Sequence, residues 1–278
     1  MKVSVASGKG GTGKTSVAVN MALSIDDVQL LDCDVEEPNA YLLLQPEIQK
    51  IEPVYSLIPI INKELCSYCG ECSKFCQYNA IFAASEKVLV FPELCHSCGG
   101  CALVCPRKAI TWEKHKIGEL NFGSSGDLAL VYGELEISNP MAVPVIKAVK
   151  MQIKDGENVI LDSPPGTSCP FVETVRGSDF CVLVTEPTPF GLHDLKIAVE
   201  VLRKIAVPFG VVVNRAGVGD KKVYDYCGEE SIRILLEIPY DRRIAELYSR
   251  GVPFSLEMPE WREKFQALYS EIVGSVGK

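Results

Sequence analysis

Short continuous runs of apolar residues recur along the chain, separated by segments in which apolar residues repeat with helical spacing. Such runs are typical of strands that are buried on both faces of a parallel sheet. The runs that we interpret as strands are Val3–Ala6, Val28–Leu31, Leu128–Tyr132, Asn158–Leu161, Phe180–Val184 and Phe209–Val213. Because these strands alternate with helices, the pattern predicts an α/β fold with a doubly wound, mostly parallel sheet.

Three further segments show helical periodicity. Leu192 to Ile205 reads as one helix, a second starts at Pro140, and the last runs from about Glu260 to Val276. The last helix places apolar residues on one face, namely Trp261, Phe265, Leu268, Tyr269, Ile272, Val273 and Val276. Its only basic residues are Arg262 and Lys264, whereas a membrane-surface helix has a lysine-rich and arginine-rich polar face. We therefore expect this helix to pack on the core.

A glycine-rich segment connects the first apolar run to the first helical one. Gly8 to Thr15 reads Gly-Lys-Gly-Gly-Thr-Gly-Lys-Thr, which fits the Walker A pattern whose backbone N–H groups and helix N-terminus cradle phosphates. Lys14 is expected to reach the β- and γ-phosphates of a nucleotide, and the Thr15 hydroxyl to hold Mg²⁺. The predicted nucleotide-binding residues here are Gly8, Gly10, Gly11, Thr12, Gly13, Lys14, Thr15 and Ser16.

Carboxylates follow two of the buried runs. Asp32 and Asp34 come directly after Val28–Leu31, and Asp162 ends the run that begins at Asn158. In open α/β sheets, ligands bind at the carboxyl ends of the strands. Asp162 therefore reads as a Walker B carboxylate that reaches Mg²⁺. For Asp32 and Asp34 the alternative is that they merely cap the next helix.

A duplicated cysteine unit occupies the chain from about Asn62 to Lys116, after a possible strand from Val54 to Ile60 that is closed by Pro59. Both copies read C-x₂-C-x₂-C-x₃-C, the spacing of bacterial ferredoxins, in which the fourth cysteine of each run ligates the other run's cluster. One [4Fe-4S] cluster would use Cys66, Cys69, Cys72 and Cys105, and the other Cys95, Cys98, Cys101 and Cys76. Zinc needs four ligands in two pairs, which would leave half of these cysteines idle. Gln77 stands where proline is usual, so only the local turn is in doubt.

Length and composition add the domain organisation. The chain has 278 residues, enough for one large α/β domain with a small insert. We predict a P-loop domain from residues 1–61 and 117–278, and an inserted ferredoxin domain from residues 62–116. The net charge of −8 and the lack of a basic cluster argue against a nucleic-acid partner. No apolar run approaches roughly 18 residues and no signal peptide is evident, so stable membrane insertion is not expected and the location should be cytoplasmic.

Lys9 narrows the class of nucleotide-binding protein. With Lys9 the loop resembles the deviant Walker A motif of the MinD/ParA/Mrp superfamily of ATPases. The resemblance implies that Lys9 reaches across an ATP-dependent dimer to the partner's phosphates. It also implies that Asp34 in switch I positions the attacking water, and that Pro-Pro-Gly166 forms switch II. The dimer would be a homodimer, or a heterodimer with a paralogous ATPase.

Two more segments resemble the family's base-binding region. Asn214 and Arg215 end the run Phe209–Val213 and match the position of an adenine-contacting asparagine. A turn or capping role for Asn214 stays open. Pro239 lies in a segment that resembles the last strand-to-helix turn, beside the base.

The remaining cysteines and the histidines give weaker indications. Cys33 and Cys181 fall in apolar strands and read as core residues. A cluster bridging two subunits would need Cys169 and Cys227 to cooperate, and we do not expect one. His96, His115 and His193 form no cluster in the sequence and support no catalytic role.

These observations lead to three hypotheses. The first is a Mg²⁺-dependent ATPase, with Lys14, Lys9, Asp34 and Asp162 as catalytic residues, whose ATP-switched dimer passes electrons from its clusters to an unidentified redox partner. The second is an assembly factor that carries iron–sulfur or other metal clusters to a partner protein. The third is a MinD-like positioning ATPase whose clusters sense redox state.

Overall fold

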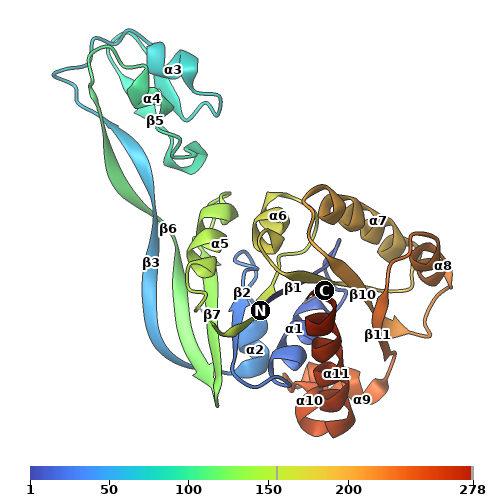
Figure 1. The fold of residues 1–278 in the computed structure, drawn as a ribbon. Coiled ribbons are helices and arrows are strands. Elements are labelled where there is room, and N and C mark those ends of the chain that lie inside the picture. Colours follow the sequence, from blue (N-terminus) through green and yellow to red (C-terminus); the bar gives the residue numbers. More distant parts are fainter. Residues whose placement is uncertain (155, 277–278) are drawn as a thin grey trace.

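The computed structural model describes residues 1–154 and 156–276. A central sheet is covered by helices on both faces, and a small cysteine-rich lobe stands away from it at the end of a long two-stranded ribbon (Figure 1). The strands are β1 (Lys2–Ala6), β2 (Val28–Asp32), β3 (Glu47–Ile61), β4 (Ile81–Ala83), β5 (Val88–Val90), β6 (Ile110–Ser125), β7 (Leu128–Leu135), β8 (Asn158–Asp162), β9 (Phe180–Thr185), β10 (Phe209–Ala216) and β11 (Ile234–Pro239).

The helices alternate with these strands in the main body and are short in the lobe. They are α1 (Lys14–Ala22), α2 (Ala40–Leu44), α3 (Glu71–Phe75), η1 (Pro92–Leu94, a 3₁₀ turn), α4 (Gly100–Leu103), α5 (Ala142–Lys150), α6 (Cys169–Val175), α7 (Pro189–Lys204), α8 (Lys222–Glu229), α9 (Arg242–Ser249), α10 (Phe254–Glu257) and α11 (Pro259–Val276).

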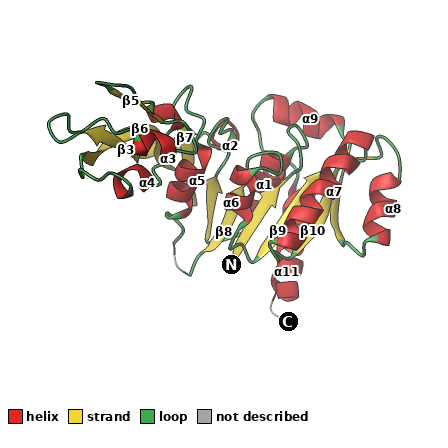
Figure 2. Ribbon diagram, turned by 90° about the horizontal axis from the view of Figure 1, so that it is seen from above, coloured by secondary structure: helices red, strands yellow, loops and turns green. Residues whose placement is uncertain are grey.

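The main sheet has nine strands in the order β11-β10-β9-β1-β8-β2-β7-β6-β3. The strands from β11 to β7 pair in parallel, and β7, β6 and β3 pair antiparallel. The predicted α/β class with a mostly parallel sheet is therefore confirmed. Seen from above, the lobe and its ribbon lie at one end of the row of strands and α8 at the other (Figure 2).

Helices cover both faces of the parallel strands, which explains why those strands are apolar throughout. Residues of α1, α2, α9, α10 and α11 form one apolar cluster with the sheet. Residues of α6, α7 and α8 form a second on the opposite side, and residues of α5 a third. With no face left in water, alternation of polar and apolar residues has no physical basis in these strands.

The last helix packs on the core as predicted, but over a narrower face. In α11 the residues Trp261, Phe265, Leu268, Tyr269 and Ile272 are buried, whereas Val273 is 45% exposed and Val276 is 39% exposed. The prediction was wrong for these two valines. Val273 lies about 100° around the helix from Ile272, and Val276 is in its last turn, at the end of the packed face. Across residues 1–154 and 156–276, no helix has the length and apolar character that crossing a membrane requires.

The ribbon is the main departure from the predicted elements. The strand expected from Val54 to Ile60 is β3, which has 15 residues, and Pro59 lies within it opposite Trp112. Proline is tolerated there because β3 is the edge strand of the sheet. Its partner β6 was not predicted, and it runs through the predicted domain boundary at residue 116.

Two predicted helix starts are also displaced. The helix expected to begin at Pro140 begins at Ala142, and the helix expected from Leu192 to Ile205 is α7, which begins at Pro189. For α7 the start is fixed by Thr188, whose hydroxyl accepts a hydrogen bond from the backbone N–H of Gly191. Proline at the first helical position fits because its missing N–H would have no partner there.

The packing of α11 gives a stability test. Phe265 is fully buried against Phe254 and Trp261, with ring centroids 5.8 and 6.4 Å away. Phe265→Ala should lower the free energy of unfolding by about 3–5 kcal/mol, because it leaves a cavity. The matched surface change, Val273→Ala, should alter it by about 0.5 kcal/mol or less. Chemical denaturation followed by circular dichroism measures both, and similar small losses would contradict the core assignment.

Candidate functional site

The glycine-rich loop lies between β1 and α1, at the carboxyl edge of the sheet. Gly11 and Gly13 have φ values of 79° and 87°, which residues with a side chain rarely adopt. A Cβ on Gly13 would lie 2.2 Å from Nδ2 of Asn214, and one on Gly8 would lie 2.3 Å from the carbonyl oxygen of Asp194. Glycine is thus required both for the backbone path of the loop and for the close approach of its neighbours.

Lys14, the first residue of α1, points into a group of carboxylates. Its side chain is 7% exposed, and its Nζ lies 2.7 Å from Oδ1 of Asp162 and 3.7 Å from Oδ2 of Asp34. Nζ also lies 3.2 Å from the hydroxyl of Thr15. Asp162 ends β8 and Asp34 follows β2, which pairs directly with β8. The structure therefore brings together the lysine, the hydroxyl and the two carboxylates singled out in the sequence.

Burial raises the pKa of two carboxylates near Lys14, those of Asp32 and Asp34. It raises the pKa of Asp32 to about 7, with a further contribution from the charge of Asp162. It raises the pKa of Asp34 to about 6, although Lys14 opposes this. For Lys14, burial acts to lower the pKa, but the charges of Asp162, Asp32 and Asp34 together raise it. Lys14 therefore remains a cation and holds the acidic group together.

Asp32 and Asp162 differ in how their oxygens are used. Asp32 accepts hydrogen bonds from the backbone N–H groups of Asp34, Asn39 and Ala40, so it braces the loop and the start of α2. This is the capping role that the sequence left open. Oδ2 of Asp162 is buried and has no hydrogen-bond partner among the described residues. The carboxylate of Asp162 and the hydroxyl of Thr15 both lie close to Nζ of Lys14, and such oxygens suit Mg²⁺, which prefers oxygen ligands and bound water.

A hollow of about 550 Å³ adjoins the loop where the sequence predicts the base. Asn214, Arg215 and Pro239 line it, together with Tyr240 and Tyr248 from the segment that includes α9. Nδ2 of Asn214 donates to the carbonyl oxygen of Thr12 at 2.8 Å, and its Oδ1 accepts from the N–H of Arg215 at 2.9 Å. Asn214 thus already ties β10 to the loop. Adenine contact remains a prediction for it.

Gly166 contacts the residue that precedes the glycine-rich loop. Its backbone N–H donates to the carbonyl oxygen of Ser7 at 3.1 Å. Pro164 and Pro165, which precede it, line a second hollow of about 290 Å³ together with Asp34. The segments resembling switch I and switch II are therefore neighbours, and both adjoin the glycine-rich loop.

The sequence reasoning missed Glu186, which follows β9 directly. Its side chain is 7% exposed, and Oε2 lies 3.5 Å from Nζ of Lys9. NH1 of Arg215 lies 2.6 Å from Oε1, close enough for an ion pair, although the geometry is not that of a hydrogen bond. The signal was present, because an acidic residue after a buried run is the pattern that identified Asp162.

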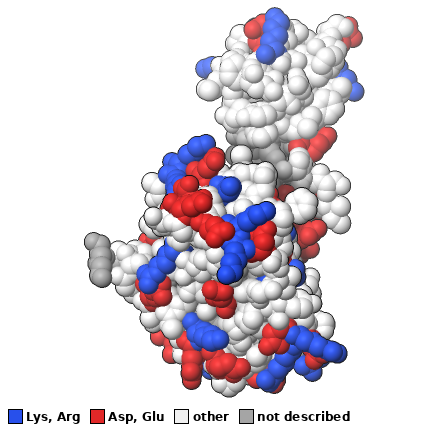
Figure 3. All heavy atoms as spheres, turned by 90° about the vertical axis from the view of Figure 1, so that its right-hand side faces the viewer, with Lys and Arg blue, Asp and Glu red and all other residues white. Residues whose placement is uncertain are grey.

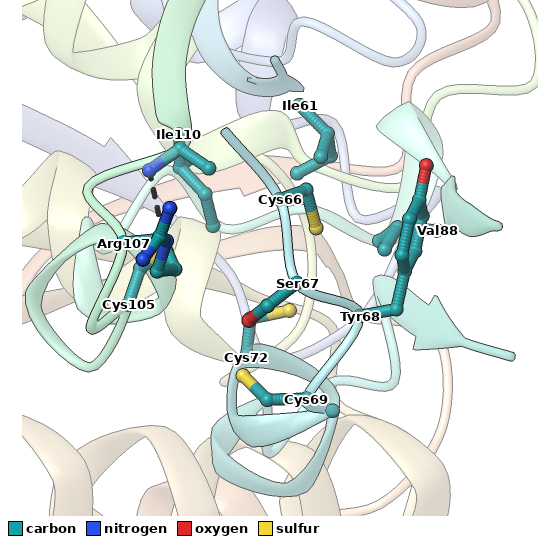
Figure 4. A pocket seen from close by; sticks show the side chains of 12 residues that line it. Ile61, Cys66, Ser67, Tyr68, Cys69, Cys72, Val88, Cys105, Arg107 and Ile110 are labelled. Carbon is teal, nitrogen blue, oxygen red and sulfur yellow. Dashed lines mark hydrogen bonds between the residues drawn. The ribbon is translucent and has the colours of Figure 1, made fainter. Parts of the chain in front are cut away.

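The cysteines of the lobe lie around two separate hollows. The residues Cys66, Cys69, Cys72 and Cys105 line the first (Figure 4), and the residues Cys76, Cys95, Cys98 and Cys101 line the second. In each hollow three cysteines come from one run and the fourth from the other. The first hollow also has Arg107 and Tyr68 in its lining, and the second has His96 and Trp112.

The eight cysteines of the two hollows are free thiols. All twelve cysteines are unpaired. Among the described residues, no three His, Cys, Asp or Glu side chains converge closely enough to hold one ion, whereas zinc would need sulfurs at about 2.3 Å. Burial raises the pKa of Cys101 to about 11, so this thiol keeps its proton at neutral pH until a metal replaces it.

The other cysteines are separate from these hollows. Cys33 and Cys181 are fully buried, as predicted, and Cys227 is buried in α8. Cys169 is exposed at the start of α6. Burial raises the pKa of the Cys227 thiol to about 11, which is consistent with an inert core residue.

Sequence comparison identifies relatives along nearly the whole chain. "Uncharacterized protein MJ0578" of Methanocaldococcus jannaschii is 31% identical, over 98% of this chain and 96% of the relative. An "Iron-sulfur cluster carrier protein" of Aquifex aeolicus is 24% identical, over 93% of this chain and 62% of the relative. The protein of that name from Methanocaldococcus jannaschii is 23% identical, over 99% of this chain and 84% of the relative.

Comparison with solved structures supports the fold. The septum site-determining protein MinD of Pyrococcus horikoshii, solved with Mg-ADP, superposes with a TM-score of 0.59 at 19% identity, covering 98% of this chain and 95% of that one. The cell division ATPase MinD of Pyrococcus furiosus gives a TM-score of 0.58, also at 19% identity, covering 99% and 98%. The family model described as the CobQ/CobB/MinD/ParA nucleotide binding domain matches residues 3–254. The chain therefore belongs to the CobQ/CobB/MinD/ParA family of nucleotide-binding proteins.

Proposed function

We propose that this protein is a Mg²⁺-dependent ATPase that carries two [4Fe-4S] clusters and couples its nucleotide state to electron transfer to a partner protein. The observation that carries the proposal is the pair of four-cysteine hollows, each completed by a cysteine of the other run. A crossed set of this kind suits two permanently held clusters, because each run is needed for both. In this proposal the lobe carries single electrons, and the edge of the sheet binds and hydrolyses ATP.

The nucleotide half of the proposal rests on a change of partners at Lys14. In the structure, Lys14 pairs with Asp162 at 2.7 Å. When phosphates enter the glycine-rich loop, Lys14 turns to the β- and γ-phosphate oxygens, and Lys9 of a second subunit adds positive charge. Thr15 and Asp162 would hold Mg²⁺, which neutralises phosphate charge. Asp34 is assigned to orienting the attacking water, so catalysis consists of positioning and charge stabilisation.

The cluster half rests on the eight lobe cysteines. Thiolates are the ligands that iron–sulfur clusters select. The backbone N–H of Ala109 donates to Sγ of Cys105 at 3.3 Å, an interaction of the kind that adjusts cluster potentials. The clusters would supply two sites that each accept one electron. Cys69 and Cys98 are exposed, so a partner could approach either cluster from solvent.

A continuous set of backbone hydrogen bonds connects the two halves. The N–H of Leu135, at the end of β7, donates to the carbonyl oxygen of Val35 in the segment resembling switch I. The N–H of Glu136 donates to the carbonyl oxygen of Ile117 in β6, at 2.9 Å. β6 begins at Ile110, which lines the first cysteine hollow, so a movement of the segment after Asp34 would act on a strand that leads to the lobe.

An iron–sulfur cluster carrier is the second candidate, favoured by the names of several relatives. The two functions differ in how firmly the iron is held. A carrier should transfer clusters to an apo-ferredoxin acceptor within minutes when Mg-ATP is added, whereas an electron carrier should reduce the acceptor's clusters and retain its own iron. A positioning ATPase is disfavoured because the apolar face of α11 is buried in the core.

The face of the molecule drawn in Figure 3 fits a protein partner better than a nucleic acid. Figure 3 shows mixed Lys, Arg, Asp and Glu over the main body on the face turned to the viewer, with few charged residues on the lobe. Strong nucleic-acid binding would need clustered positive charge. We assign the partner to the lobe, near the cysteine hollows.

Lys14→Ala tests the independence of the two halves. It should abolish ATP binding, because it removes the phosphate-binding cation and leaves Asp162 buried without a partner. Iron content should be unchanged, because the lobe lies on its own ribbon. Isothermal titration calorimetry with Mg-ATP and a colorimetric iron assay measure the two effects. Lys204→Ala, which changes an exposed lysine of α7, is the control and should alter neither. Loss of iron along with ATP binding would contradict the separation.

Paired serine substitutions test the crossed ligand sets. Cys69→Ser with Cys105→Ser removes two ligands of one cluster, so roughly half of the iron should remain. Cys69→Ser with Cys76→Ser removes one ligand of each cluster, and both should be lost or weakened. If each run held its own cluster, the two results would be exchanged. Iron content and the EPR spectrum of the reduced protein distinguish the two patterns.

A further inference from the structure

Glu186 is a buried carboxylate to which the proposed ATPase cycle assigns no role. It lies between two cations, Lys9 of the glycine-rich loop and Arg215 of the base hollow. The side chain of Lys9 is 29% exposed and that of Arg215 is 52% exposed, whereas that of Glu186 is 7% exposed. The carboxylate is therefore fixed in the interior, while both cations have a route to solvent.

The backbone around Glu186 has little freedom to move. A Cβ on Gly191 would lie 2.2 Å from the carbonyl oxygen of Glu186, and one on Gly219 would lie 1.9 Å from that of Pro187. Arg215 adopts a left-handed backbone conformation with φ of 54°, which is uncommon for a residue other than glycine. The hydroxyl of Ser7 donates to the carbonyl oxygen of Lys9 at 2.7 Å. These backbone contacts restrict the positions of all three charged residues.

Because Glu186 pairs with both Lys9 and Arg215, it keeps one cation when the other moves away. Removing the only partner of a buried charge is strongly unfavourable, because an uncompensated charge stays in the interior. When Lys9 swings away, Glu186 retains Arg215 at 2.6 Å. Lys9 is thus the exchangeable member of the group. Arg215 already neutralises much of the charge of Glu186. Lys9 can therefore leave when a more negative site competes for it.

We propose that Glu186 is a positioning residue that retains Lys9 on its own subunit until a nucleotide-loaded second copy of the chain attracts it. Glu186 thereby sets the threshold for ATP-driven dimerisation. The γ-phosphate of ATP adds negative charge at the end of the nucleotide where Lys9 of the other subunit would arrive. ADP lacks that group and leaves Lys9 on Glu186. This inference rests on the proposed function, in which Lys9 acts across a dimer.

Glu186→Gln keeps the size of the side chain and removes its charge. Sedimentation velocity with a saturating, non-hydrolysable ATP analogue and Mg²⁺ gives the protein concentration at half dimerisation. We expect the variant to dimerise at a concentration about fivefold lower than the wild type, the effect of removing a partly exposed ion pair. Glu230→Gln, which removes an exposed ion pair with Arg203 on the far side of α7, should leave the concentration unchanged.

Two further variants separate the positioning role from a general effect on packing. Arg215→Gln should raise the dimerisation threshold, because Glu186 then depends on Lys9 alone; a titration of the monomer with labelled nucleotide ensures that the site is saturated. Lys9→Ala should lose the ATP-dependent dimer whether or not Glu186→Gln is also present, because Glu186 acts only through Lys9. A packing effect of Glu186→Gln would instead promote dimerisation of the Lys9→Ala protein as well.

The outcomes distinguish this inference from the proposed function. A wild type that dimerises with ATP, together with a Glu186→Gln variant that needs the same or a higher concentration, overturns the role of Glu186 and leaves the ATP-dependent dimer intact. If the wild type and the variant both stay monomeric with ATP, the dimer and the role of Glu186 are overturned together.

Discussion

The buried ion pair between Lys14 and Asp162 is the interaction on which the rest of the nucleotide site depends. Three carboxylates, from Asp32, Asp34 and Asp162, lie around one lysine in a site nearly closed to water. Removing one member of a buried pair costs about 3–5 kcal/mol, so Lys14 cannot leave Asp162 unless other charges arrive. Phosphates would give Lys14 a new negative partner, and a divalent cation would give Asp162 a new positive one. The charges of the site thus favour a nucleotide that arrives with a divalent cation.

The order of the strands explains how these charges are brought together and how the nucleotide site is connected to the lobe. β1, β8 and β2 are adjacent, so the loop after β1 and the carboxylates after β8 and β2 meet at one edge. β7 is the next strand, and it pairs with β6, which continues into the lobe. The nucleotide site and the cysteine hollows are therefore connected through neighbouring strands of one sheet.

Most of the parallel sheet could be predicted because its strands are buried on both faces and are short apolar runs. The Lys14 site could be predicted because one motif fixes its backbone. The strand β6 was missed because residues 112–116 are polar or aromatic, and its pairing with β3 joins residues far apart in the sequence. The exposure of Val273 was missed because the width of a packed helix face depends on its neighbours. The acidic residue after β9 was visible in the sequence, but its partners were not, because Lys9 lies in the glycine-rich loop and Arg215 in β10.

The central claim is that nucleotide state and cluster state are coupled. A redox titration of the reconstituted protein under anaerobic conditions, monitored by EPR with and without Mg-ATP, tests it most directly. Local charge, hydrogen bonding and solvent exposure set cluster potentials, so a nucleotide-driven movement that reaches the lobe must change them. The account predicts a reproducible shift of at least one cluster potential with ATP and a smaller shift with ADP. Identical potentials in all three conditions would contradict it.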